Sequence, residues 1–438
     1  MKASHTAYPR ALVAALIVMT SHAAAGEPTA QPEPRSVALP SVDASSTLDQ
    51  LVAYAWATSP EVRAAEQRWL AAQARPAQEG SLPDPKVDYM LDVTNRIHEQ
   101  EIVVMQGVPW PGKLDRRRDA ASLAADSEER RVEAVRQGIR QKVADAYYEL
   151  AYLSRAIAIT NDALGFVSQS EQAARAQYLT KTENAYAKLL QAQVERARIE
   201  NDLATLIARI APERARLNAA LGRNPADPVP TNAQLPDTLL DADDAHVLAR
   251  LREKSPALAA LASDIASRQA SERAARLESY PDLEFGVGGD VTEETVIFRA
   301  AITIPLWDGK NKARVREAVA NRLLAAHERE AAINDLEAAT SRLLFEHRDA
   351  HRKATLLEHV IIPKADEAVR STLACCGAGT ATLLESLDTQ RTLLSVQLEH
   401  ERARADRAQA LAALEAIVGE PLPTRTDDPP ATPEGASR

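Results

Sequence analysis

The 438-residue sequence predicts a mainly α-helical chain that also carries the strands of a membrane β-barrel. Three observations lead to this fold class. The composition is typical of long helices, since alanine, leucine, arginine and glutamate dominate and aromatic residues make up only 4%. The chain contains an internal two-fold repeat. In each half, a short stretch of strand-like alternation separates long segments with coiled-coil periodicity, so we expect long helical hairpins and four β-strands per chain.

The repeat is visible as short motifs that recur at a spacing of 196 to 198 residues. Five such pairs keep the same order in both halves, which chance rarely produces. They are Ser59-Pro60 and Ser255-Pro256, Pro83-Asp84 and Pro281-Asp282, Val108-Pro109 and Ile304-Pro305, Gly112-Lys113 and Gly309-Lys310, and Leu221-Gly222 and Val418-Gly419. We expect the first copy at 48–222 and the second at 243–419, with a linker at 223–242.

The first 25 residues have the pattern of a secretory signal peptide. Lys2 and Arg10 supply positive charge, an apolar run follows, and small residues end the segment at Ala25. The apolar run is too short to span a bilayer as a helix. The Pro-rich segment 26–47 and the tail 420–438 are expected to be extended. We therefore expect an exported protein, without a cysteine near the cleavage region to carry a lipid.

Each copy contains one predicted β-hairpin. Strands are expected at about 85–94 and 101–108, with apolar residues at the alternate positions Val87, Tyr89, Leu91 and Val93. The second hairpin is expected at about 282–291 and 295–304, with apolar residues at Leu283, Phe285, Val287 and Val291. Each hairpin is thus apolar on one face and polar on the other, and long enough to cross a bilayer when tilted. Open sheet edges are not viable in lipid, so several chains must share one barrel.

Long helices flank each hairpin. In the first copy we expect helices at 48–79, 111–177 and 185–221, with a turn (the first tip) at about 178–185. In the second copy we expect them at 243–278, 310–376 and 382–419, with the second tip at about 375–382. The two shorter helices of each copy together match the long one in length, so they can stack along it as a two-stranded coiled coil. Pro212 and Pro363 are expected to bend their helices or to mark their ends.

Trp110 and Trp307 occupy equivalent positions where the second strand of each hairpin ends. Aromatic side chains at such positions form girdles at the membrane boundary. The alternative is that each tryptophan packs at the start of the helix that follows. The equivalence of the two positions in the repeat favours the girdle.

These features resemble the TolC family of outer-membrane efflux proteins over roughly residues 48–423. The most specific match begins at Cys376, where Cys-Gly-Ala-Gly-Thr-Ala-Thr-Leu-Leu-Glu-Ser-Leu-Asp-Thr-Gln is similar to the family's tip signature Tyr-x-x-Gly-x-x-Ser-x-x-Asp-Leu-Leu-x-Ala-Gln. The strand exits, Gln106 to Lys113 and Ala301 to Lys310, look like the branch that serves heavy-metal exporters of the resistance–nodulation–division (RND) type.

The resemblance implies a homotrimer with a twelve-stranded barrel in the outer membrane and a twelve-helix tunnel in the periplasm. Such a duct passively conducts its cargo, here heavy-metal cations. It works with a periplasmic adaptor (a membrane fusion protein) and an inner-membrane RND pump.

The resemblance also implies roles for residues at the two tips. Glu385 and Asp388 fall where the family has acidic residues that ring the periplasmic pore entrance, and the alternative is a solvated coiled-coil face. Contact with the adaptor is expected at Tyr178, Lys181, Cys376, Gly379 and Thr382. The chain departs from the family pattern at both tips, so the family's closure contacts are not carried over. The departures are Cys376 for a tyrosine, Ala381 for a basic residue, Lys181 for a glycine and Ala187 for an acid.

No motif of catalytic chemistry stands out, so we expect neither an enzyme nor a cofactor. Adjacent Cys375 and Cys376 are a weak candidate for a soft metal ion, and the alternative is a pair of small packing residues. His347 and His351 are a second weak candidate, for which a solvated helix face is favoured. The net charge of −10 argues against nucleic acid as a partner.

Two alternatives remain open. The same duct could serve drug efflux or type I secretion, because the pump selects the cargo. A periplasmic coiled-coil adaptor or scaffold would explain the helices and the signal peptide. It would not explain two amphipathic hairpins that end in Pro, Trp and Gly at matching positions.

Overall fold

The computed structural model describes residues 42–43, 45–94, 97–180, 185–230, 234–290, 295–378 and 380–426. The first part of the described chain contains α2 (Leu48–Thr58), α3 (Pro60–Glu79), β1 (Lys86–Thr94), β2 (Ile97–Val108), α4 (Lys113–Leu179) and α5 (Ala185–Leu221). A short strand, β3 (Thr238–Leu240), follows. The remaining elements are α6 (Asp244–Lys254), α7 (Pro256–Leu277), β4 (Asp282–Asp290), β5 (Thr295–Thr303), α8 (Asp308–Leu356), the π-helical turn η1 (Leu357–Ile361), α9 (Ile362–Gly377), α10 (Leu383–Val418) and β6 (Thr424–Thr426).

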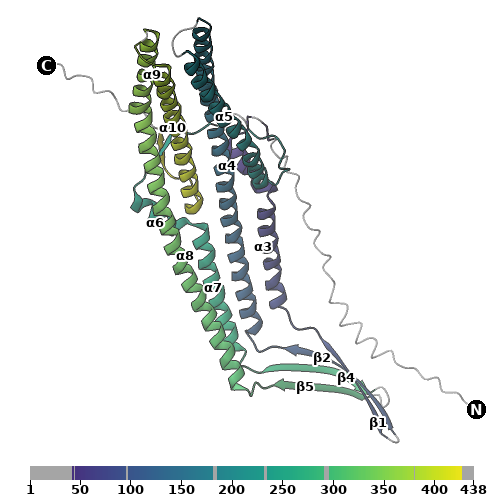
Figure 1. Ribbon diagram of the computed structural model, residues 1–438. Coiled ribbons are helices and arrows are strands. Elements are labelled where there is room, and N and C mark those ends of the chain that lie inside the picture. Colours follow the sequence, from purple (N-terminus) through teal and green to yellow (C-terminus); the bar gives the residue numbers. More distant parts are fainter. Residues whose placement is uncertain are drawn as a thin grey trace, which may run out of the picture. The chain divides into compact units, whose positions relative to one another are not determined.

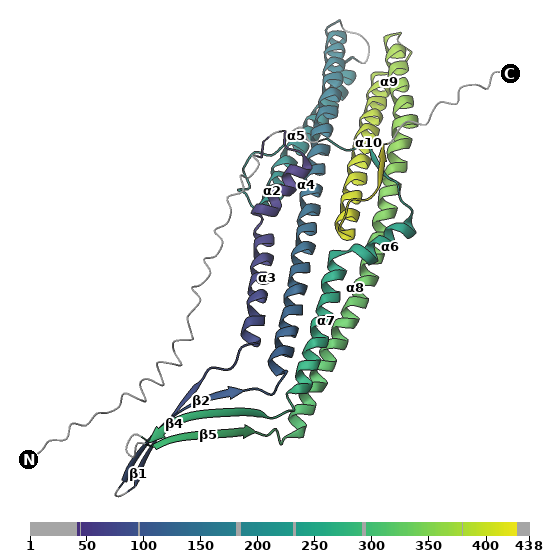
Figure 2. The same ribbon diagram turned by 180° about the vertical axis from the view of Figure 1, so that it is seen from behind.

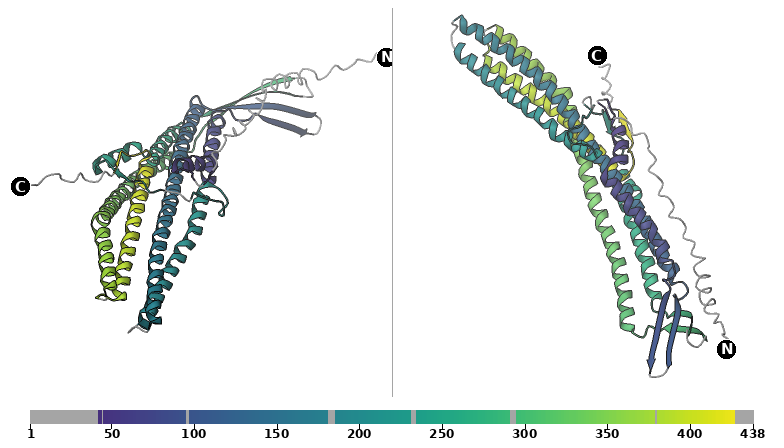
Figure 3. Two further views of the ribbon diagram at one scale, coloured as in Figure 1. Left: turned by 90° about the horizontal axis from the view of Figure 1, so that it is seen from above. Right: turned by 90° about the vertical axis from the view of Figure 1, so that its right-hand side faces the viewer.

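The described chain is mainly helical, as predicted, and its four longer strands lie together at one end of the helices (Figures 1 and 2). Figure 3 shows the two helical hairpins running side by side away from this sheet. The first hairpin is α4 with α5, and the second is α9 with α10. None of the helices in the described ranges combines the length and the apolar composition that a membrane crossing requires. The predicted signal peptide 1–25 lies outside the described residues.

The helix predicted at 48–79 is wrong in one respect, because it is broken at Ser59-Pro60 into α2 and α3. The proline ring disfavours helical geometry at Ser59, whose ψ of 127° is extended. The helix predicted at 243–278 is broken in the same way at Ser255-Pro256. The sequence contained both motifs, but helical periodicity on either side concealed the break.

A glycine packs against each of these breaks. It directly follows the last long helix of each half, α5 or α10. Gly222 has φ +67°, and a Cβ there would lie 2.9 Å from the Thr58 carbonyl oxygen. Gly419 has φ +89°, and a Cβ there would lie 2.5 Å from Cδ of Pro256. The left-handed backbone and the close approach both require glycine. Each half therefore contains the same contact, in which a glycine packs against a Ser-Pro break.

The two prolines predicted to disturb helices behave differently. Pro363 follows the π-helical turn η1, so the helix predicted at 310–376 is divided into α8, η1 and α9. A proline ring clashes with the carbonyl four residues earlier in a regular helix, and the wider turn accommodates it. Pro212 lies inside α5, which continues on both sides. Its predicted role as a helix end is wrong.

The three largest apolar clusters of the described residues hold the helices together. The first joins α2, α4 and α5 through residues that include Leu51, Val143 and Leu217. The second joins α6, α8 and α10 through Val247, Leu344 and Leu414. The third joins the two hairpins near their tips, where Val167, Ile199, Leu387 and Leu394 meet. Burial of such side chains contributes about 1.5–3 kcal/mol each, so packing between helices stabilises the bundle.

The longer strands form one antiparallel sheet in the order β1-β2-β4-β5. A second sheet pairs β3 with β6, with Leu239 opposite Arg425. Within the tail predicted from residue 420, Thr424–Thr426 is thus an extended strand, and its partner β3 was not predicted. No alternating pattern is visible in three residues, so this pairing could not be read from the sequence.

Candidate functional site

One face of the four-stranded sheet is apolar on every strand. Residues directly opposite in a ladder lie on the same face, and residues two apart along a strand share that face. Tyr89 is opposite Ile102, Val104 is opposite Val287, and Leu283 is opposite Ile302. The large residues of this face are mostly exposed, up to 79% for Phe298. They are Val87, Tyr89, Leu91, Ile102, Phe285, Val287, Val296, Phe298 and Ile302. The alternating residues of the predicted hairpins thus form one apolar surface, which is interrupted on β2 by Gln100 and Gln106.

The opposite face is polar and crossed by ion pairs. Lys86 Nζ lies 3.3 Å from Glu284 Oε1, across β2. Arg299 Nη2 lies 2.6 Å from Glu101 Oε2, across β4. Each pair joins one basic and one acidic side chain, so the two charges neutralise each other on this face. The residues concerned were not identified from the sequence, because only the ladder register brings them together.

Two glycines of β4 leave room for side chains and backbone of β2 between these ion pairs. A Cβ at Gly286 would lie 2.1 Å from Met105 Sδ, and one at Gly288 would lie 2.1 Å from the Ile102 carbonyl oxygen. Val103 and Met105 fill that space and are buried. The polar face therefore contains an apolar patch in its middle, which the simple polar assignment of this face did not predict.

The sheet has two open edges. In the described residues, β1 and β5 each pair with only one strand, so each presents a free row of backbone groups. Both edge strands carry the apolar face to the rim of the sheet. A long edge strand of this kind is a template for pairing with another chain.

Trp110 and Trp307, the predicted girdle residues, have different surroundings. The Trp110 ring stacks on Tyr280, with centroids 5.6 Å apart, and its backbone N–H donates to Asp282 Oδ1 at 2.9 Å. The Trp307 side chain is exposed. Beside Trp110, Lys113 is only 2% exposed and its Nζ lies 2.8 Å from Asp282 Oδ1. Asp282 is partly exposed, at 39%. This ion pair was not predicted, although the Gly-Lys motif that contains Lys113 was identified.

The second tip is a capped turn. Thr382 Oγ1 accepts from the Glu385 backbone N–H at 3.3 Å, and the Thr382 backbone N–H donates to Glu385 Oε2 at 2.7 Å. Donation by Thr382 holds the pKa of Glu385 below its ordinary value. The Cys375 carbonyl accepts from the backbone N–H of Thr380 and of Ala381 at 2.9 and 3.2 Å. Glu385 thus caps α10, a role that the sequence reading missed although Thr-x-x-Glu is a capping signature.

Asp388, the other predicted entrance residue, is well exposed and lies 3.8 Å from Arg391 Nη1. Arg391 itself binds Glu195 of α5, and Nε lies 3.0 Å from Glu195 Oε1. The two hairpins are therefore tied together by an ion pair just above the tips. Asp388 remains accessible, while Glu385 is engaged at the helix start.

The first tip carries an exposed aromatic pair. The rings of Tyr178 and Tyr186 lie 5.7 Å apart at a tilt of 43°. Of the predicted adaptor contacts, Tyr178 and Thr382 are exposed in the described tips. Cys376 is partly exposed. Lys181 and Gly379 lie outside the described residues.

The weak metal candidates are not assembled into a site. In the described ranges no group of three or more His, Cys, Asp or Glu side chains is arranged to hold a metal ion. Cys375 is exposed and Cys376 partly exposed, so the reading of buried packing residues is wrong for Cys375. His347 is only 3% exposed, which contradicts the predicted solvated face. Burial lowers the pKa of His347 to about 4, and nearby Arg407 acts in the same direction.

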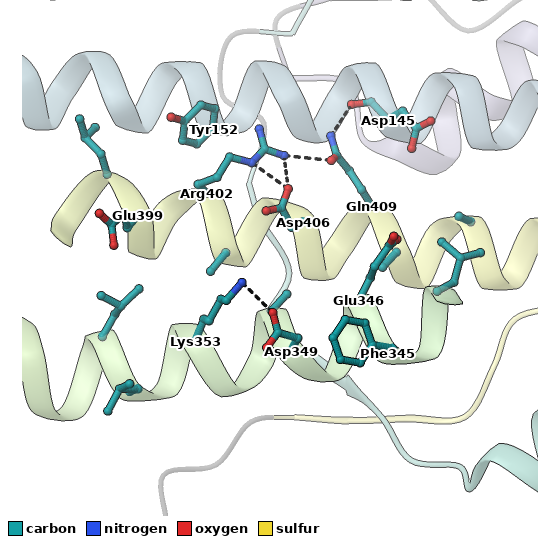
Figure 4. Close-up of a pocket in the computed structure, with 18 of the residues that line it drawn as sticks. Asp145, Tyr152, Phe345, Glu346, Asp349, Lys353, Glu399, Arg402, Asp406 and Gln409 are labelled. Carbon is teal, nitrogen blue, oxygen red and sulfur yellow. Dashed lines mark hydrogen bonds and ion pairs between the residues drawn. The ribbon is translucent and has the colours of Figure 1, made fainter. Parts of the chain in front are cut away.

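A groove of about 910 Å³ lies between α4, α8 and α10 (Figure 4). Both basic side chains of its lining are paired with carboxylates. Arg402 lies 2.6 Å from Asp406 and stacks over Tyr152 at 4.7 Å, and Lys353 lies 2.6 Å from Asp349. Lys353 and Arg352 hold the pKa of Asp349 below its ordinary value by hydrogen bonding. The lining includes five carboxylates and two basic side chains, so the groove has an excess of negative charge.

The model of one protein family, described as "Outer membrane efflux protein", matches residues 247–420. Residues 247–420 form an outer membrane efflux protein domain. This efflux domain contains α7 to α10 and the hairpin β4-β5. The resemblance stated from the sequence is confirmed. Channels of this family are transport ducts and not enzymes, which confirms the prediction that the chain is not an enzyme.

Individual relatives agree with the efflux domain. The chain is 22% identical over 353 residues to the cobalt-zinc-cadmium resistance protein CzcC of Cupriavidus metallidurans, covering 77% of this chain and 81% of CzcC. It is similar to crystal structures of CusC, with a TM-score of 0.71 and 17% identity over 85% of this chain and 92% of that chain. It is also similar to the outer membrane protein VceC of Vibrio cholerae, with a TM-score of 0.72 and 18% identity over 85% and 96%. These structural likenesses show that the fold is that of outer-membrane channels.

Proposed function

We propose that this chain is the outer-membrane exit duct of a tripartite efflux system. Three copies would pool their sheets into a twelve-stranded barrel, and their helical hairpins would form a tunnel in the periplasm. One observation carries the proposal. All four strands contribute to a mainly apolar face that no part of the described chain covers, on a sheet with two open edges. Lipid would cover the face, and closure between copies would remove the edges.

The proposal includes the predicted domain organisation. The signal peptide 1–25 would direct export, and the halves 48–222 and 243–419 would be two copies of one unit. The common element order supports the repeat, as does the Gly222 and Gly419 packing against a Ser-Pro break in both halves. The hairpins supply a second argument. Lys86 is opposite Met105, and their equivalents Glu284 and Ala301 are also opposite each other.

The ends of the duct would have different partners. Trp110 and Trp307 would lie at the membrane boundary, at the ends of β2 and β5. The tips would meet a periplasmic adaptor through Tyr178, Lys181, Cys376, Gly379 and Thr382, with an RND pump beyond it. The exposed Tyr178–Tyr186 pair supports this assignment, because exposed aromatic residues are enriched at protein interfaces.

The cargo we propose is heavy-metal cations. The support is the similarity to CzcC, whose name states resistance to cobalt, zinc and cadmium. Asp388 is accessible for a ring of three carboxylates at the entrance, which would favour cations. Glu385 would contribute its charge to the same ring while capping α10.

The proposal is tested with the full-length chain. It should fractionate with the outer membrane, require detergent for extraction and have the native mass of three copies. Extraction by salt alone, with the mass of a single chain, would instead support a periplasmic scaffold. In a planar bilayer, Asp388→Asn should reduce cation selectivity at low salt, and the effect should fade near 1 M salt, where the Debye length is about 3 Å. Asp406→Asn, in the groove between the helices, is the matched control.

A further inference from the structure

The ion pair of buried Lys113 with partly exposed Asp282 joins the two halves of the chain where the strands meet the helices. Lys113 Nζ donates to Asp282 Oδ1 and to the Tyr280 carbonyl oxygen, both at 2.8 Å. The Trp110 backbone N–H donates to the same carboxylate oxygen at 2.9 Å. The Trp110 ring covers Tyr280. Lysine, tryptophan and aspartate therefore form one compact contact at the start of α4, between β2 and β4.

The turn that contains the lysine of this contact occurs a second time in the chain. The turn Trp110-Pro-Gly-Lys113 has its counterpart in Trp307-Asp-Gly-Lys310. In both, the lysine backbone N–H donates to the tryptophan carbonyl, at 3.0 and 3.1 Å. Lys310 and Trp307 are nevertheless exposed, whereas Lys113 is buried. The second turn is built like the first but has no partner for its lysine among the contacts described for that turn.

The segment that contains the aspartate of this contact also occurs twice in the chain. Asp282 lies in Ser279-Tyr-Pro-Asp282, and Asp84 lies in Ser81-Leu-Pro-Asp84. Asp84 is exposed, as is Leu82 at the position equivalent to Tyr280. Within one chain Lys310 and Asp84 cannot meet, because they belong to opposite edges of the sheet with β2 and β4 between them.

We propose that Lys310 of one copy forms an ion pair with Asp84 of the next copy, in which the lysine becomes buried and Trp307 covers Leu82. This seam repeats between chains the contact that Lys113 and Asp282 make within the chain. It rests on the proposed shared barrel and names the residues that close it.

The strand register that follows from this equivalence provides a check. In the β2–β4 ladder, Val108 is opposite Leu283. The equivalent residues, Ile304 and Pro85, would be opposite each other between β5 and the neighbour's β1. Extending this ladder places Ile302 opposite Val87, Ala300 opposite Tyr89 and Phe298 opposite Leu91. All six lie on the apolar face, so the apolar surface continues across the seam. A slip by one residue would instead place Asp88 on that face.

The register is tested by disulfide cross-linking. In a background with Cys375→Ser and Cys376→Ser, the variant Asp88→Cys with Ala301→Cys places two thiols opposite each other on the polar face. Paired strands bring Cα atoms to about 4.5–5.5 Å, which permits a disulfide. Mild oxidation should give covalent multimers of the full chain in denaturing gels. The matched control, Asp88→Cys with Ala300→Cys, places the thiols on opposite faces and should stay monomeric in the gel.

The ion pair is tested by charge reversal, scored by the temperature at which the assembled ring dissociates in detergent. Asp84→Lys or Lys310→Asp alone should weaken association by about tenfold or more, and so lower this temperature, because each leaves two like charges facing each other in the seam. The double reversal should restore most of the loss.

The outcomes distinguish failure of the proposed seam from failure of the proposed duct. If the native mass is that of three copies but the off-register control cross-links, or the double reversal does not restore the ring, the seam is overturned and the duct stands. If the native mass is that of one chain and neither pair cross-links, both fail. The cysteine variants keep Lys310 and Asp84, so they also report on the seam if the reversed variants do not fold.

Discussion

The helical part and the sheet of this protein treat apolar side chains in opposite ways. The helices bury a core of large apolar residues such as Leu51, Leu217 and Leu414, although others, such as Leu324 and Phe345, are exposed. In the sheet, Val87, Val296 and Phe298 are among the most exposed large apolar residues of the described chain. The helices thus bury a core of their own. The apolar face of the sheet, in contrast, needs lipid or another chain to cover it.

The largest effect should come from cutting into the helical core. Leu217→Ala should lower the free energy of unfolding by about 2–5 kcal/mol, because a fully buried leucine leaves a cavity. The measurement is chemical unfolding in detergent, followed by helical circular dichroism. The matched change in the sheet, Leu91→Ala, should cost under about 1 kcal/mol by the same measurement. Equal costs at the two sites would contradict the comparison.

Charge placed on the two faces of the sheet sharpens the comparison. Phe285→Arg, on the apolar face, should cost about 2–4 kcal/mol of insertion if lipid covers that face, and should reduce the amount of assembled protein in the outer membrane. Asp88→Arg, on the polar face, should assemble normally. Assembly is measured as heat-modifiable protein in membrane fractions. Similar yields from both variants would show that lipid does not contact the apolar face.

His347 tests whether the helical interior is as dry as its packing indicates. Burial lowers its pKa to about 4 from 6.5, so the unfolded chain binds a proton that the folded chain refuses. The stability from neutral His347 is therefore fully present above pH 6.5 and is lost as the pH falls towards 4, by on the order of 3 kcal/mol. His347→Leu should flatten the dependence of unfolding free energy on pH in this range. His327→Gln, at an exposed position, should leave it unchanged.

The smallest effect is expected at the second tip, where the change removes a hydrogen bond and no buried apolar side chain. Thr382→Ala removes one half of the capping box and should destabilise the start of α10 by about 1 kcal/mol. Hydrogen exchange of the first turn of α10 measures the change. Thr392→Ala, farther along the same helix, should leave that exchange rate unaltered. An equal rise in exchange for both variants would exclude a specific cap.

Part of the candidate site was predictable because it depends on local pattern. The alternation of Tyr89 and Leu91, and of Phe285 and Val287, predicted both hairpins and their apolar faces. Thr382-x-x-Glu385 contained the cap, but the acidic residue was interpreted only as a pore residue. The burial of His347 could not be predicted, because the helix periodicity around it does not identify which neighbouring helix covers it.

The sequence alone determined the mainly helical fold, the two hairpins and the resemblance to outer-membrane efflux proteins. These depend on periodicities of 3.6 and 2 residues and on short motifs, all of which are local. Only the tertiary structure decided which residues meet across elements. The pairs Lys113–Asp282, Arg299–Glu101 and Arg391–Glu195 join residues more than 150 positions apart. Their proximity follows from strand register and from packing between helices, which no local stretch of the chain contains.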